Sequence, residues 1–109
     1  ESVRMGKGNI ITFGCRFSCN TSLGDFNILN GNISMGHDSS LGSFNVLFPE
    51  TRISGQTVVG NSNFFGARVF VSQCLKIGNN CRFGAGSYVL RKTKDGYLYM
   101  GNPAKRVEF

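Results

Sequence analysis

His37 and Asp38 are the residues best suited to acid–base chemistry, and His37 is the only histidine in the chain. A neutral imidazole can remove a proton from a hydroxyl or amino group near neutral pH, and an adjacent carboxylate can orient the ring or raise its basicity. The pair is therefore a candidate general base with its partner. Judged from these two residues alone, a surface His-Asp pair without a catalytic role is the alternative.

Basic residues near the C-terminal end are candidates for binding phosphate. The chain has 12 Lys and Arg against 6 Asp and Glu, a formal net charge of +6, which favours anionic partners. Lys92, Lys94 and Lys105 could bind phosphate groups as point charges, although a solvated basic surface is the alternative. The aromatic residues follow no RNA-recognition consensus, so we expect no nucleic-acid partner.

The cysteines indicate a reduced protein without a metal site. Cys15, Cys19, Cys74 and Cys81 form no Cys-x-x-Cys pair, and a single histidine offers little for zinc. We therefore expect reduced, buried thiols in a cytoplasmic protein, with no metal bound. Because no long apolar run occurs, we expect neither a signal peptide nor a membrane span.

A six-residue repeat determines the elements that must position these side chains. Every sixth residue from Met5 to Val89 is apolar, glycine often follows it, and the residue four places after it is mostly small. A period of six fits neither a helix nor an amphipathic strand. The apolar positions are Met5, Ile11, Phe17, Leu23, Leu29, Met35, Leu41, Leu47, Ile53, Val59, Phe65, Val71, Ile77, Phe83 and Val89.

Six residues can form one short strand and a two-residue bend. Gly and Asn tolerate the positive φ that such bends need, and three strands with their bends close a triangular coil of eighteen residues. We therefore expect about five stacked coils over residues 1–90, with a capping tail over residues 91–109. The predicted bends include Lys7-Gly8, Cys19-Asn20, Gly31-Asn32, Asn79-Asn80 and Ala85-Gly86.

This uninterrupted pattern, from Val3 to Val107, resembles the hexapeptide-repeat acyltransferases. The ending Gly101-Asn102-Pro103-Ala104-Lys105 is similar to the Gly-x-Pro-Ala-Lys motif common among them. The resemblance implies an all-β fold, a left-handed parallel β-helix with a C-terminal loop and strand. The left hand comes from the resemblance, because crossovers between parallel strands are usually right-handed.

Residues 36–44 and 53–55 resemble a stretch of the bacterial sugar acetyltransferases of the PglD and NeuD type. The resemblance implies that His37 is the general base and Asp38 its partner. It also implies that the backbone N–H of Gly55 serves the acetyl carbonyl, where it could stabilise the oxyanion formed when the acceptor attacks the thioester. Without the resemblance, Gly55 would be interpreted as a turn glycine.

Two further positions follow from the same resemblance. Asn30 matches an Asn that contacts the sugar, although it could be only a turn residue. Val46 stands where the family often has a second His close to the thioester. This difference could alter how acetyl-CoA is held.

Acetyl-CoA is the donor that the resemblance implies, bound in a groove between subunits of a homotrimer. Ala67 and Ala85 fall at the corner that would hold the pantetheine arm, although small residues also simply suit bends. Lys92 and Lys105 are candidates for the phosphates. Exposed Ile28, Val46, Val58, Phe64 and Phe70 would leave apolar patches on a monomer, which favours the trimer.

The sequence thus predicts direct transfer of acetyl from acetyl-CoA to an amino or hydroxyl group of a sugar or nucleotide-sugar in a ternary complex. γ-Carbonic anhydrases share the prism but need three histidines around zinc, so that class is excluded. A non-catalytic trimerising module is the remaining alternative, and Val46 favours it.

Overall fold

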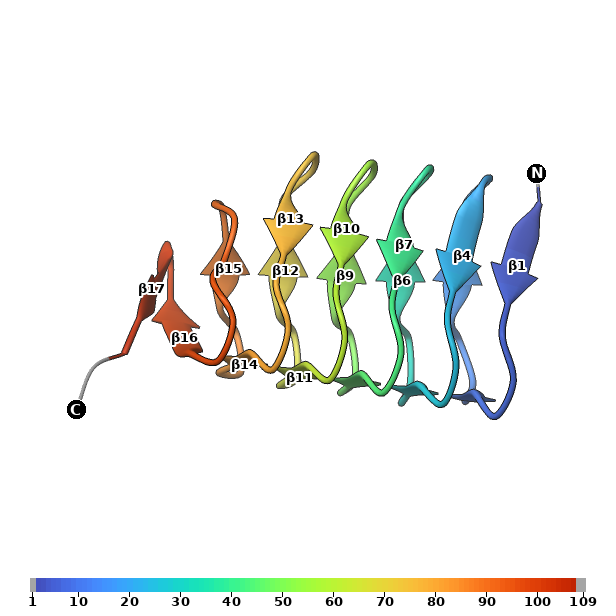
Figure 1. The fold of residues 1–109 in the computed structure, drawn as a ribbon, viewed down its shortest axis with the longest axis horizontal. Coiled ribbons are helices and arrows are strands. Elements are labelled where there is room, and N and C mark those ends of the chain that lie inside the picture. Colours follow the sequence, from blue (N-terminus) through green and yellow to red (C-terminus); the bar gives the residue numbers. More distant parts are fainter. Residues whose placement is uncertain (1, 108–109) are drawn as a thin grey trace.

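The computed structural model describes residues 2–107, and its regular elements in this range are strands (Figure 1). No helix in that range is long and apolar enough to cross a membrane. The strands form three sheets, which we call faces A, B and C. Face A contains β1 (Val3–Met5), β4 (Thr21–Leu23), β7 (Ser40–Leu41), β10 (Val58–Val59) and β13 (Lys76–Ile77). Face B contains β2 (Ile10–Ile11), β5 (Ile28–Leu29), β8 (Val46–Leu47), β11 (Phe64–Phe65), β14 (Arg82–Phe83), β16 (Leu98–Gly101) and β17 (Ala104–Arg106). Face C contains β3 (Arg16–Phe17), β6 (Ser34–Met35), β9 (Arg52–Ile53), β12 (Phe70–Val71) and β15 (Tyr88–Val89).

Each coil stacks on the next with an offset of eighteen residues. Val46 of β8, for example, pairs in parallel with Ile28 of β5 and Phe64 of β11. The chain visits faces A, B and C in turn, so a column along the prism contains residues that share one repeat position. The predicted all-β, left-handed parallel β-helix of about five turns is confirmed.

The apolar column of the repeat forms the core. Its residues from Leu23 to Val89 are buried, and the rings of Phe65, Phe83 and Tyr99 stack on successive coils, with centroids 4.6 and 5.7 Å apart. Met5 on the first coil is 46% exposed because no coil covers it among the described residues. Burial of this column supplies the main driving force for folding.

A ladder of asparagines lies at the junction of faces A and B. We call Asn9, Asn27, Asn45 and Asn63 the asparagine ladder. Within it, each side-chain oxygen accepts the backbone N–H of the ladder position one coil further on, at 2.8–2.9 Å. Each side-chain nitrogen donates to a glycine carbonyl of the neighbouring coil. The polar atoms of these side chains are thereby satisfied inside the prism.

The bends form three edges, named AB, BC and CA after the faces that they join. The second residue of each predicted bend pair has positive φ: Gly8 (72°), Asn20 (58°), Asn32 (55°), Asn80 (56°) and Gly86 (74°). This left-handed conformation turns the chain through each corner, and it explains the Gly and Asn at these positions. Phe26, at 57°, adopts the same conformation, so the corner geometry overrides residue preference.

The tail covers the last coil. β16 extends face B beside β14, and β17 returns antiparallel to it (Figure 1). Thr93 Oγ1 and Asp95 Oδ1 accept the N–H groups of Gly78 and Asn79 at 3.0 and 2.8 Å. The tail therefore supplies the hydrogen bonds that a further coil would otherwise make.

The four cysteines are free thiols, but the expectation that they are buried is wrong for two of them. Cys81 is buried, Cys15 is partly buried, and Cys19 and Cys74 are exposed. The last two occupy bend positions of edge CA. Bend side chains project from the prism, whereas the small inward column holds Cys15 and Cys81.

Candidate functional site

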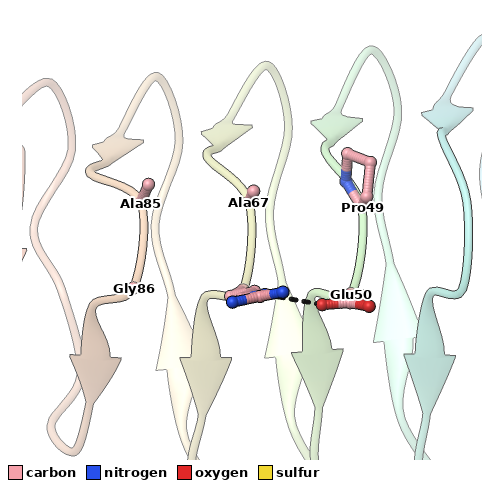
Figure 2. Close-up of a pocket in the computed structure, with 6 residues that line it drawn as sticks. Pro49, Glu50, Ala67, Ala85 and Gly86 are labelled. Atoms are coloured by element: carbon pink, nitrogen blue, oxygen red, sulfur yellow. Dashed lines mark hydrogen bonds and ion pairs between the residues drawn. The ribbon is translucent and has the colours of Figure 1, made fainter.

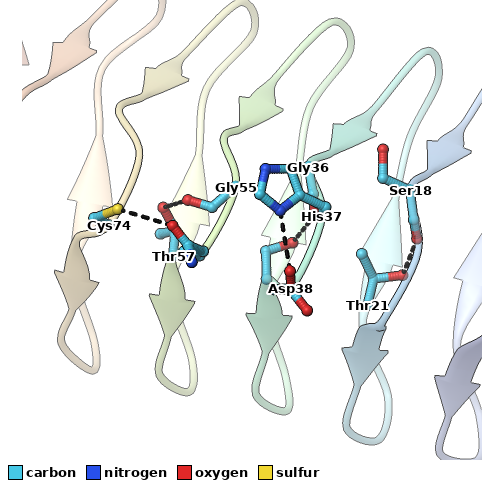
Figure 3. Close-up of polar contacts among 10 residues, drawn as sticks. Ser18, Thr21, Gly36, His37, Asp38, Gly55, Thr57 and Cys74 are labelled. Atoms are coloured by element: carbon cyan, nitrogen blue, oxygen red, sulfur yellow. Dashed lines mark hydrogen bonds and ion pairs between the residues drawn. The ribbon is translucent and has the colours of Figure 1, made fainter.

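His37 and Asp38 form the bend of edge CA between β6 and β7. Nδ1 of His37 lies 3.0 Å from Oδ2 of Asp38, and both side chains are about half exposed (Figure 3). The hydrogen bond with His37, and then one with the Asn20 side chain, lower the pKa of Asp38. An ionised carboxylate only accepts hydrogen bonds, so Nδ1 carries the proton and Nε2 is left as the acceptor.

Gly55 occupies the equivalent bend position one coil further on, beside the imidazole (Figure 3). A Cβ placed on Gly55 would lie 2.8 Å from His37 Nε2 and 3.1 Å from Cδ2. The backbone also joins the two coils, since Gln56 N–H donates to the His37 carbonyl at 2.8 Å. The basic nitrogen of His37 therefore lies against the Gly55 backbone, and a larger residue at position 55 would require the imidazole to move.

The three edges differ in how their bend N–H groups are used. Along edge AB, the first bend residue donates its N–H to a side chain of the next coil at 2.7–2.9 Å. The N–H groups of Gly55 on edge CA and of Ala67 and Ala85 on edge BC have no acceptor within residues 2–107. Edge AB is thus closed by its own side chains, whereas edges CA and BC present donors to a ligand. The repeat pattern did not predict this distinction, although the polar residues Asp25, Ser43, Asn61 and Asn79 in one column were its signal.

A groove runs along edge BC (Figure 2). Its volume is about 570 Å³, and its lining is Pro49, Glu50, Ala67, Arg68, Ala85 and Gly86. Ala67 and Ala85 lie in one column, and Arg68 Nε donates to Glu50 Oε1 at 2.6 Å beside them. The small side chains leave the backbone accessible to an extended, hydrogen-bonding ligand.

The predicted site residues do not all meet in one chain. His37 and Gly55 lie on edge CA, whereas Ala67 and Ala85 lie on edge BC. Asn30 follows β5 at the start of an edge BC bend, and its side chain is exposed. Val46 lies on the outer surface of face B, between Ile28 and Phe64. Two residues lie in one column of an edge when they are a multiple of eighteen residues apart in sequence. None of the four residues Asn30, Val46, Ala67 and Ala85 is separated from His37 by such a multiple.

The three lysines predicted to bind phosphate also lie apart from one another. Lys92 lines a cavity of about 290 Å³ with Lys76, Asn79 and Asp95. Lys105 lines another of about 340 Å³ with Arg91. Lys94 is exposed, and its backbone N–H donates to the Tyr99 hydroxyl at 2.9 Å. Across the described range, no group of three or more His, Cys, Asp and Glu side chains could hold a metal ion.

The sequence matches no protein-family model and no curated protein. Among solved structures, a His-to-Asn mutant of perosamine N-acetyltransferase from Caulobacter crescentus, in complex with CoA and GDP-perosamine, is 31% identical with a TM-score of 0.97 over 99% of this chain and 51% of that one. The acetyltransferase domain of PglB from Neisseria gonorrhoeae is 26% identical with a TM-score of 0.80, over 96% of this chain and 54% of that one. A hexapeptide-repeat acetyltransferase from Vibrio cholerae, complexed with acetyl-CoA, shares the fold at 18% identity with a TM-score of 0.88, over 96% of this chain and 69% of that one. The chain spans about half the length of the first two structures.

Proposed function

We propose, because this chain belongs to the hexapeptide-repeat acyltransferases, that it transfers acetyl from acetyl-CoA to an amino or hydroxyl group of a sugar or nucleotide-sugar. Two of its structural neighbours are acetyltransferases, one of them in complex with CoA and a nucleotide-linked sugar. The observation that carries the proposal is the contact of the His37 imidazole with Gly55, whose N–H has no acceptor in the described part of the chain.

In the proposed reaction, Nε2 of His37 removes a proton from the acceptor as its nitrogen or oxygen attacks the thioester carbon. Asp38 holds the ring through Nδ1–H and favours the imidazolium that forms. The Gly55 N–H donates to the carbonyl oxygen as it becomes an oxyanion. The tetrahedral intermediate collapses by breaking its carbon–sulfur bond, and the leaving thiolate takes the proton from His37.

The donor site that we propose needs a second copy of the chain. The pantetheine arm would lie along edge BC against Ala67 and Ala85, whereas His37 and Gly55 belong to edge CA. A donor held between two copies can contact edge BC of one and edge CA of the other. In this homotrimer, Lys92 and Lys105 would bind CoA phosphates and Asn30 would contact the sugar. Free cysteines fit the reducing cytoplasm, where we place the reaction.

The first prediction is a large loss of rate in His37→Ala. Thiol release from acetyl-CoA would be measured with a panel of amino sugars and nucleotide-linked sugars. Removing a general base typically costs about 10²–10⁴-fold in rate, so we expect kcat to fall within this range. Gln73→Ala, at an exposed position of the same edge, serves as the control and should keep the wild-type rate. An unchanged rate in His37→Ala would remove His37 from the mechanism.

A non-catalytic trimerising module is the second candidate, favoured by the apolar residues on the outer surface of face B. Ile10, Ile28 and Phe64 are each more than a third exposed there, and Val46 lies among them. A chain that forms trimers but neither binds acetyl-CoA nor releases thiol with any acceptor would support this candidate over the enzyme.

A further inference from the structure

We propose that the outer surface of face C binds the phosphate group of the acceptor through Arg16, Ser34 and Arg52. The role in acetyl transfer rests on the proposed function, whereas the anion site rests on the geometry alone. Arg16 pairs with Ser34, and Ser34 pairs with Arg52, on the adjacent strands β3, β6 and β9. Neighbouring strands lie about 4.8 Å apart, so the two arginines begin about 10 Å apart, on either side of the serine.

These side chains border a cavity at the start of the strands. Its volume is about 460 Å³, and its lining is Arg16, Asn32, Ser34, Glu50, Thr51 and Arg52. The lining also includes the Ser34 hydroxyl and the Asn32 amide, whereas the Thr51 hydroxyl is buried in the prism and donates to the Gly66 carbonyl at 3.0 Å. Guanidinium groups bind phosphate oxygens through paired N–H donors, and hydroxyl and amide groups complete such a shell.

The charges at this cavity favour an anion. Glu50 is its only carboxylate, and it already forms an ion pair with Arg68 on the next coil. Arg16 uses Nη1 to donate to the Gly14 carbonyl at 3.2 Å, which leaves most of its five donors available. The backbone N–H of Arg52 donates to the Val69 carbonyl, and its guanidinium group forms no hydrogen bond or ion pair within residues 2–107. The two guanidinium groups therefore leave a net positive charge that no described carboxylate offsets.

The cavity lies at the start of the strand that leads to the proposed catalytic base. β6 begins at Ser34, and the chain reaches His37 three residues later, so their Cα atoms are at most about 10 Å apart. An extended acceptor with its phosphate over Ser34 would reach His37 along the outer surface of β6. The acceptor that fits this arrangement is a sugar bearing a phosphate ester or diphosphate, with its free amino or hydroxyl group directed to His37.

The first test measures anion binding without any enzymatic turnover. Inorganic pyrophosphate would be titrated calorimetrically into the wild type, the Arg16→Gln/Arg52→Gln double variant and Arg4→Gln. Arg4 is the matched control, because it pairs with Ser22 on the outer surface of face A and has no second arginine beyond that serine. We expect saturable binding that weakens with salt, a loss of at least about tenfold in the double variant and no change in Arg4→Gln. Equal binding by the wild type and the double variant, or no saturable binding, would overturn the site.

The second test distinguishes acceptor phosphate from CoA phosphate. With a nucleoside-diphosphate amino sugar as acceptor, the double variant should raise the acceptor KM about tenfold and leave the acetyl-CoA KM unchanged. With an amino sugar that lacks phosphate, the wild type and the double variant should not differ. A rise in the acetyl-CoA KM alone would assign the arginines to the donor and overturn the proposal. If no acceptor releases thiol, the proposed function fails, while pyrophosphate binding still decides whether the anion site exists.

Discussion

At the scale of single residues, His37, Asp38 and Gly55 lie together because the coil repeats every eighteen residues. Asp38 adjoins His37 in sequence, and Gly55 follows it by one coil, so the corner places a carboxylate, an imidazole and a backbone N–H side by side. The left-handed conformation of Asp38, with φ 58°, is required by the corner, and Asp and Asn tolerate it better than most residues. Aspartate at position 38 therefore suits both the positive φ of the corner and a hydrogen bond to the His37 ring.

We predict that Asp38→Asn slows catalysis by about tenfold, less than His37→Ala does, because the carboxylate acts through the ring. The hydrogen bond from His37 lowers the pKa of Asp38, so the carboxylate stays ionised throughout pH 5 to 8. The native pair's contribution to stability is present above the ordinary pKa of Asp and is lost only as the pH falls through the lower native value. The ratio of wild-type to variant rates in thiol-release assays should therefore be constant above about pH 8, where an imidazole is neutral with either partner. A ratio that still changes with pH in that range would contradict an Asp38 carboxylate that is ionised throughout.

We predict that Gly55→Ala reduces the rate of acetyl transfer without unfolding the chain. The backbone of Gly55 does not have positive φ, but the new methyl group would lie 2.8 Å from His37 Nε2 and push the ring aside. In the His37→Ala background the same change should cost little, because the clash no longer exists. Kinetics of the two single variants and the double variant measure this coupling, and independent effects would contradict the contact.

At the scale of the elements, each coil must supply hydrogen-bond partners to the next. The asparagine ladder does so inside the prism, and the side chains of edge AB do so at the surface. The other two edges leave bend N–H groups without acceptors in the described range. Surface donors can bond to water at little cost, so these edges remain folded while they offer N–H groups to a ligand.

We predict that Asn45→Ala lowers the free energy of unfolding by about 1–3 kcal/mol, because buried partners lose their hydrogen bonds. Asn45 is fully buried; its side-chain oxygen accepts Asn63 N–H at 2.9 Å, and its side-chain nitrogen donates to the Gly60 carbonyl at 3.0 Å. Asn61→Ala is the control, since Asn61 is exposed on edge AB and water can replace its bond to Ser43 N–H. Urea denaturation compares the two, and an equal loss would contradict the role of burial.

At the scale of the whole molecule, the three faces of the prism have different surfaces. Ile28, Val46 and Phe64, three of the five residues predicted to drive trimerisation, form one outer column on face B. Val58 lies instead on face A, and Phe70 lies on face C. The outer surface of face C carries Arg16 and Arg52. Face B is therefore the surface that we assign to contacts between copies.

We predict that Phe64→Asp dissociates the trimer and abolishes thiol release, because the proposed donor site needs two copies. Phe64 is 36% exposed on face B, so the charge would face the neighbouring copy and leave the core intact. Val58→Asp, at a position 50% exposed on face A, should leave the assembly unchanged. Sedimentation at micromolar concentration measures both variants, and a wild-type protein that is already monomeric would contradict the trimer.

The amino-acid sequence determined the period, and with it the core, the bends and the edge to which each residue belongs. These follow from sequence because inward side chains and corner conformations recur at fixed intervals, so that His37 and Gly55 could be placed together before any coordinates. Tertiary structure alone decided which bend N–H groups are satisfied, that Cys19 and Cys74 are exposed, and that Lys92 and Lys105 lie in different cavities. The period places Arg16, Ser34 and Arg52 in one outer column of face C, and the tertiary structure shows that they line one cavity. Such features depend on the way in which long side chains extend across neighbouring coils. A repeat pattern specifies where a side chain leaves the backbone, but it does not specify where the charged or polar end of that side chain lies.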